Sequence, residues 1–189
     1  PGLLSDRQTA TDLTPEIQGK IISFLSDRVP PNCYFIEKNP WHIVQIPFIQ
    51  AVYSNIKIIH VIRDGRDVAC SMIPGGLSHL HTPSWQQLSN KYTGVELYAR
   101  IWQEAIEIAL TDLQDTSHYT CYYHELLSNP IAVTRGILDY LGLPWNSKVG
   151  AYCRRVSDKT AGSYHARFQD TYYTPDHSTR IGRYKENLT

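Results

Sequence analysis

The segment KIIHVIRDGRDVACSM, residues 57–72, constrains the fold of this chain more than any other part of the sequence. Its first six residues are rich in β-branched side chains and show little alternation between apolar and polar residues. Such a run is typical of a strand covered on both faces, as in a parallel sheet. Arg63-Asp64-Gly65 then predicts a tight turn, and we expect a helix to begin near Arg66.

Strand-like and helix-like segments alternate along the chain, which predicts an α/β fold with a parallel sheet and helices on both faces. We expect one domain covering residues 1–189. Apolar runs predict strands at 33–36, 57–62 and 119–123, and apolar periodicity predicts helices at 14–28, 42–53, 85–112, 130–141 and 147–156. Loops are expected at 74–83 and 124–129. Ligands bind at the carboxyl ends of such strands, which here are followed by Lys38, by Arg63 and by residues 123–125.

Composition excludes some classes of protein. Lys+Arg number 18 and Asp+Glu number 18, which argues against a nucleic-acid partner held by bulk positive charge. No apolar run approaches the roughly 18 residues needed to cross a membrane, and no signal peptide is visible. Cys70 and Cys121 lie in apolar segments and are expected to be buried thiols rather than disulfides or metal ligands. A cytoplasmic location is therefore expected, with the Golgi lumen as the alternative if a membrane anchor precedes this segment.

Arg63 is the first candidate for a binding site, because it follows a strand and precedes a helix. Its guanidinium can fork onto a phosphate, and the helix start adds backbone N–H donors and a positive dipole end. Ser71, eight residues later in the same helix, could add a hydroxyl. The alternative is a structural salt bridge from Arg63 to Asp64 or Asp67, and spacing alone does not decide between the two.

The string VIRDGRDVACSM resembles the 3′-phosphate-binding segment of the sulfotransferases that use 3′-phosphoadenosine 5′-phosphosulfate (PAPS). In that family the arginine after the strand and the serine eight residues later bind the 3′-phosphate of the nucleotide, and Arg63 and Ser71 match both. Further similar elements follow the family's order. They are EKNP at 37–40, YYHELLSNP at 122–130, ILDYLGLPW at 137–145 and IGRYKENL at 181–188.

The resemblance implies roles for further residues. Lys38 would contact the phosphosulfate and stabilise charge on the leaving phosphate, and Tyr123 would lie against the nucleotide. Gly182 and Lys185, near the end of the chain, would close over the 3′-phosphate. The alternatives are a surface lysine paired with Glu37, a core aromatic residue, and a solvated basic tail.

The resemblance also implies a P-loop-NTPase-like sulfotransferase fold and transfer of a sulfuryl group to a hydroxyl or amine acceptor, without a metal. The family's first strand and its phosphate-binding loop have no counterpart here, so we expect this chain to be an N-terminally truncated fragment that could be inactive alone. The general base is unassigned, with Glu37 and His42 as candidates. The acceptor could be a carbohydrate, a peptide, a lipid or a small molecule, and its contacts are expected within residues 73–98.

Two other functions remain open at this point. One is a phosphotransferase of another kind, which would need a GxxxxGK[ST] loop and magnesium ligands, and neither is visible. The other is a non-catalytic member that binds nucleotide or a protein partner. Loop histidines His79 and His81, with His42, His60 and His124, match no zinc spacing, so no metal site is predicted.

Overall fold

The computed structural model describes residues 7–73, 83–157 and 181–187. The chain divides into two compact units, which are treated separately below. The described part of unit one covers residues 7–56 and 83–117, and that of unit two covers 57–73, 118–157 and 181–187. Whether residues 1–189 behave as one domain stays a prediction. The expected loop at 74–83, with His79 and His81, lies almost entirely outside the described residues.

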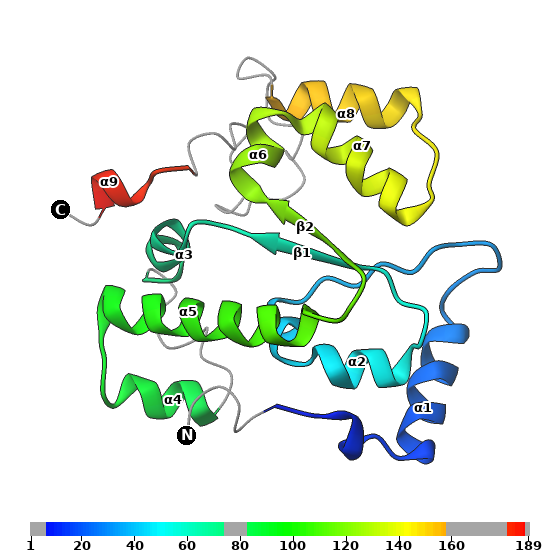
Figure 1. The fold of residues 1–189 in the computed structure, drawn as a ribbon, viewed down its shortest axis with the longest axis horizontal. Helices are drawn as coiled ribbons and strands as arrows, with labels where there is room; N and C mark the ends of the chain where they lie inside the picture. The colour runs from blue at the N-terminus through cyan, green and yellow to red at the C-terminus, as the bar shows by residue number, and fades with distance from the viewer. Residues whose placement is uncertain (1–6, 74–82, 158–180, 188–189) are drawn as a thin grey trace. The chain divides into compact units, whose positions relative to one another are not determined.

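Unit one is helical (Figure 1). Its longest helix, α5 at Gly94–Leu113, packs against η3 at Pro40–Val44 and α2 at Ile46–Val52. The buried face of α5 carries apolar residues at helical spacing, namely Leu97, Ile101, Ala105, Ile108 and Leu113. The other elements are η2 at Ala10–Asp12, α1 at Pro15–Ser26 and α4 at Pro83–Ser89.

The helix predicted at 14–28 is confirmed. The Thr14 hydroxyl accepts a hydrogen bond from the Ile17 N–H at 3.2 Å, and Pro15 occupies the first turn. The helix predicted at 42–53 is divided in two, because η3 ends at Val44 and α2 begins at Ile46. Pro47 lies in the first turn of α2, where its missing N–H costs no helical hydrogen bond.

Two predictions for unit one are wrong. Residues 33–36 form no strand, and Tyr34 and Ile36 are 75% and 80% exposed. An apolar run becomes a strand only with a ladder partner, and none pairs with it among the residues described. The single helix expected at 85–112 is two helices, because α4 ends at Ser89 and Gly94 has a φ of 53°. That left-handed conformation interrupts a continuous helix at a residue that tolerates it.

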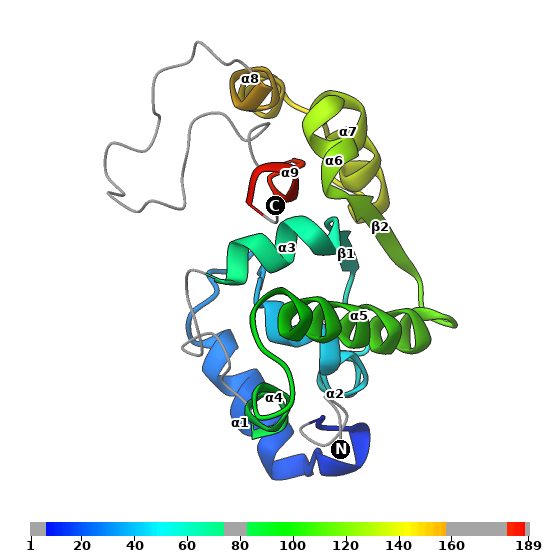
Figure 2. The same ribbon diagram turned by 90° about the vertical axis from the view of Figure 1, so that its left-hand side faces the viewer.

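Unit two is built on two parallel strands, β1 at Ile58–Ile62 and β2 at His118–Tyr122. Their register pairs Ile58 with His118 and Ile62 with Tyr122. This confirms the predicted parallel pairing. Helices α6 at Tyr123–Ser128 and α7 at Pro130–Leu141 contact β2, and α8 at Ser147–Ser157 contacts both of these helices (Figures 1 and 2). Helix α3 at Gly65–Met72 follows β1 and contacts α9 at Tyr184–Asn187.

The strand predicted at 119–123 ends one residue early, and the loop predicted at 124–129 is mostly the short helix α6. Turn-forming residues at Ser128-Asn129-Pro130 suggested a loop, but they act instead as a junction between two helices. The Asn129 side chain accepts from the Ala132 N–H at 3.4 Å and so caps α7. The predicted bounds of α7 are confirmed, and Gly142 follows its last residue.

Cys70 and Cys121 are buried free thiols, as predicted, and Cys33 is exposed. Burial raises the pKa of both buried thiols. No helix among the residues described is long and apolar enough to cross a membrane.

His60 on β1 is expected to make the stability of the protein depend on pH. Its side chain is 7% exposed, and neither ring nitrogen has a hydrogen-bond partner among the described residues. Burial lowers the pKa of His60, and His118 lowers it further. The unfolded chain takes up this proton near pH 6.5, at about its ordinary value, while the folded chain takes it up only at lower pH.

Stability is therefore expected to fall as the pH drops below about 6.5, because the unfolded state then binds more protons. Urea unfolding at a pH of about 7.5 and of about 5.5 would measure this loss in the wild type. The variant His60→Gln should lose less stability between the two. Equal losses in both proteins would rule out His60 as the source.

Candidate functional site

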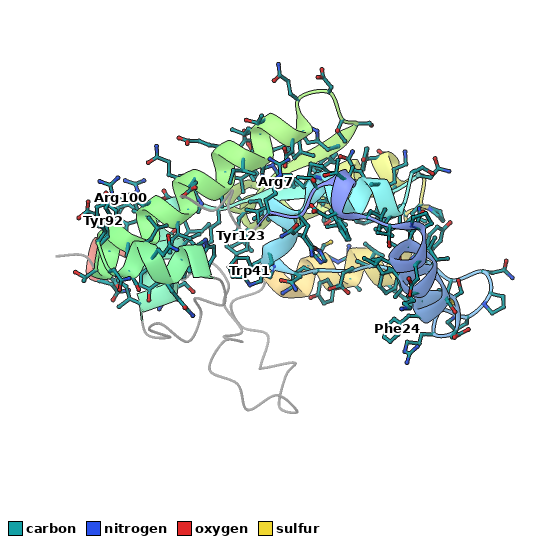
Figure 3. The ribbon with its side chains drawn as sticks, turned by 90° about the horizontal axis from the view of Figure 1, so that it is seen from below. Arg7, Phe24, Trp41, Tyr92, Arg100 and Tyr123 are labelled. Carbon is teal, nitrogen blue, oxygen red and sulfur yellow. The ribbon has the colours of Figure 1, made fainter. Side chains whose placement is uncertain are left out.

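The carboxyl ends of the two strands bring Arg63 and Tyr123 together. Both residues directly follow a strand, and the register of β1 with β2 makes these ends neighbours. The guanidinium carbon of Arg63 lies 5.3 Å from the centroid of the Tyr123 ring, within cation–π range. Figure 3 labels Tyr123 among the side chains. The sequence prediction that Arg63 and Tyr123 belong to one site fits this geometry.

Asp64 caps α3 directly after Arg63. Its carboxylate accepts from the Arg66 backbone N–H at 2.9 Å and forms a salt bridge with the Arg66 guanidinium at 2.7 Å. The hydrogen bond between the two side chains lowers the pKa of Asp64 and raises the pKa of Arg66. Asp64 was one of the two acids expected as alternative partners of Arg63, and its salt bridge goes to Arg66.

Asp67, the other expected alternative, is fully buried and faces the C-terminal segment. One carboxylate oxygen accepts from the Gly182 N–H at 2.8 Å, and the other accepts from the Tyr184 N–H at 3.3 Å. The guanidinium of Arg66 lies over the Tyr184 ring at 3.9 Å. Helices α3 and α9 are accordingly neighbours, as Figure 2 shows.

These parts enclose a pocket of about 270 Å³. Four of the residues predicted from sequence line it: Arg63, Tyr123, Gly182 and Lys185. The other lining residues are Asp64, Asp67, His124, Ile181 and Tyr184. The pocket combines two cationic side chains with two carboxylates and with aromatic and aliphatic surface. Both carboxylates already have partners, Asp64 in Arg66 and Asp67 in two backbone N–H groups. The cations and the aromatic rings suit an anionic ligand with a planar ring.

Two predicted site residues lie outside the lining. Ser71 is half-buried on α3, one helical turn after Asp67 on the same face, and does not line the pocket. Lys38 is exposed and belongs to unit one, so the structure does not test whether it faces this pocket. The strand expected before Lys38 is absent from the residues described.

Sequence reasoning missed Asp67 and Tyr184. Asp67 was weighed only as a partner for Arg63, although its position four residues before Ser71 placed it on the same helical face. Tyr184 lies in the segment IGRYKENL that the resemblance singled out, but nothing in the sequence distinguished this tyrosine from a solvated one. In the part of the chain that the structure describes, no group of three or more His, Cys, Asp or Glu residues could hold a metal.

Comparisons with known proteins identify the family of the chain. The model of the sulfotransferase family matches residues 5–147, well over half of the sequence, and the chain therefore belongs to the sulfotransferase family. Protein-tyrosine sulfotransferase A of Caenorhabditis elegans is 27% identical over 128 residues, covering 65% of this chain and 30% of that protein. The protein-tyrosine sulfotransferase of Drosophila melanogaster is 26% identical over 135 residues, covering 69% of this chain and 24% of that protein.

A solved structure is similar as well. The sulfotransferase domain from the curacin biosynthetic pathway superimposes with a TM-score of 0.54 at 16% identity, covering 70% of this chain and 46% of that one. This likeness confirms the predicted α/β sulfotransferase fold. The chain spans less than half the length of the curated relatives that it matches.

Proposed function

We propose that this chain forms part of a sulfotransferase that takes a sulfuryl group from PAPS and passes it to a tyrosine hydroxyl of a protein acceptor. The observation that carries the proposal is the pocket at the strand ends, where Arg63 and Tyr123 lie beside Gly182 and Lys185. Family membership supports the reaction class. The names of the relatives, protein-tyrosine sulfotransferases, support the acceptor.

The pocket residues fit the nucleotide half of PAPS. The Arg63 guanidinium can bind two oxygens of the 3′-phosphate, and the start of α3 adds backbone N–H groups nearby. The Tyr123 ring offers a face for the nucleoside. Lys185 adds a second cation, and in our proposal Ser71 approaches the phosphate only when nucleotide is bound.

The transfer breaks the bond between sulfur and the bridging oxygen of the 5′-phosphate and forms a bond between sulfur and the acceptor oxygen. Negative charge develops on the leaving phosphate, and we assign Lys38 to stabilise it. The acceptor proton passes to a base, for which Glu37 and His42 are the candidates near Lys38. The protein contributes chiefly position and charge, as in phosphoryl transfer.

Transfer of ³⁵S-sulfate from labelled PAPS to a tyrosine-containing peptide tests the proposal. The label is expected on that peptide and not on a matched peptide with phenylalanine in place of tyrosine. Binding of 3′-phosphoadenosine 5′-phosphate without transfer to the tyrosine peptide, by the intact natural protein, would instead favour a non-catalytic nucleotide-binding role.

A further inference from the structure

The buried carboxylate of Asp67 has no role in the function proposed above. Asp67 is 2% exposed, and its two oxygens accept from two backbone N–H groups, those of Gly182 and Tyr184. The donors lie more than a hundred residues away in sequence. One side chain of α3 therefore holds the backbone of the C-terminal segment, residues 181–187, at two points.

A buried negative charge at this place destabilises the protein unless other groups compensate for it. Burying a carboxylate requires compensating hydrogen bonds, and a carboxylate near an anion site also repels the anion. The two N–H donors supply the compensation, and the bonds they form are of the strong, charge-assisted kind. A residue whose only task was to fill space on α3 would not need a charge.

A second contact acts on the same segment. The Arg66 guanidinium lies 3.9 Å from the centroid of the Tyr184 ring, and it also forms a salt bridge with Asp64 at 2.7 Å. Gly182 adopts a φ of 75°, which brings its N–H to Asp67 in a conformation that favours glycine. The Lys185 side chain packs beside Gly182, with its Cε 3.8 Å from where a Cβ would be.

The held segment completes the pocket. Ile181, Gly182, Tyr184 and Lys185 form one part of the lining, and Arg63 and Tyr123 form another part. If the segment left α3, Arg63 would keep its place at the end of β1, but the pocket would lose the second cation and an aromatic ring.

We propose that Asp67 is a positioning residue, which docks the C-terminal segment on α3 and so sets Gly182 and Lys185 against the bound nucleotide. This inference rests on the proposed function of the pocket. It predicts that removing the charge of Asp67 weakens nucleotide binding, although removing a negative charge near an anion should by itself strengthen binding.

Amide hydrogen exchange tests the docking without any nucleotide. In Asp67→Asn the amide nitrogen of the new side chain would face a backbone donor, so at least one of the two bonds is lost. Exchange at Gly182 and Tyr184 is expected to rise about tenfold or more, the loss typical of one hydrogen bond to a charged group. Exchange at Arg135 and Gly136, inside helix α7 of the same unit, should stay slow, which shows that the fold is kept. Unchanged exchange at Gly182 and Tyr184 would overturn the docking.

Titration with 3′-phosphoadenosine 5′-phosphate tests the consequence, with Asp139→Asn as the control. Both variants remove one negative charge from unit two, and Asp139 is exposed on α7 and does not line the pocket. Asp139→Asn is expected to bind like the wild type, and Asp67→Asn about tenfold more weakly. Tighter or unchanged binding by Asp67→Asn would show that Asp67 does not position the site.

Gly182→Ala strains the same segment and leaves the side chain at position 67 unchanged. It is expected to weaken nucleotide binding too, because alanine disfavours a φ of 75°. Unchanged binding in this variant would overturn the positioning role. A wild-type protein that fails to bind the nucleotide would refute the proposed function on which the positioning role rests. The exchange measurement would then still decide whether Asp67 docks the segment.

Discussion

Replacing Arg63 with alanine is expected to weaken binding of 3′-phosphoadenosine 5′-phosphate by about a hundredfold or more. Two charge-assisted hydrogen bonds to one phosphate are lost, and each contributes about 1.5–3 kcal/mol. The Tyr123 ring loses the guanidinium that lies 5.3 Å from it, which is a smaller effect. Isothermal titration with the wild type and the variant measures the change.

Two further variants make this result specific. Arg63→Lys keeps the charge but not the fork, so it should recover only part of the affinity. Arg100→Ala is the matched control, because Arg100 is an exposed arginine that pairs with Glu96 and lies over the Tyr92 ring (Figure 3). It should bind like the wild type. Wild-type affinity in Arg63→Ala would remove Arg63 from the site.

Replacing Lys38 with alanine is expected to lower kcat by about a hundredfold, a loss typical of removing one group that stabilises developing charge. The affinity for 3′-phosphoadenosine 5′-phosphate should change far less, because the 3′-phosphate is assigned to Arg63. Steady-state sulfate transfer and titration, run on the same preparation of the intact natural protein, separate the two quantities.

Lys20→Ala is a suitable comparison for Lys38→Ala. Lys20 is another exposed lysine of unit one, and its ion pair with Glu16 is of the exposed kind that contributes little. Its kcat should equal that of the wild type. A Lys38→Ala variant with wild-type kcat would show that charge on the leaving phosphate is stabilised by another group.

The sequence was sufficient for elements whose signals are local. The caps of α1 and α7 are formed by Thr14 and by Asn129 with proline directly after each, and both helices begin where these residues predict. The β-branched run of β1 likewise predicted a strand in the right place. Arg63 could be placed at the strand end because the residues directly after it, Asp64 and Gly65, are typical of a turn.

Features that depend on residues far apart in the chain could not be predicted from the sequence. Residues 33–36 have the composition of a strand, but strand formation needs a partner, which composition does not reveal. The contact of Asp67 with Gly182 and Tyr184 joins residues more than a hundred positions apart. Sequence reasoning considered only Arg63 as a partner of Asp67, and the hydrogen bonds to the C-terminal segment came from the structure.

The break between α4 and α5 has a different origin. Apolar positions continue at helical spacing across 85–112, and this periodicity does not predict the left-handed conformation at Gly94. A single glycine within a helical pattern is compatible with a continuous helix or with an interruption, and the packing of the unit decides between them.

The central claim is that the pocket at the ends of β1 and β2 recognises the 3′-phosphate of the sulfate donor. The most direct test is the affinity of the wild-type protein for 3′-phosphoadenosine 5′-phosphate compared with adenosine 5′-phosphate, which differs only in lacking that phosphate. Our account predicts that the first binds about a hundredfold more tightly, as expected for two charge-assisted hydrogen bonds. Equal affinity for the two nucleotides would contradict it.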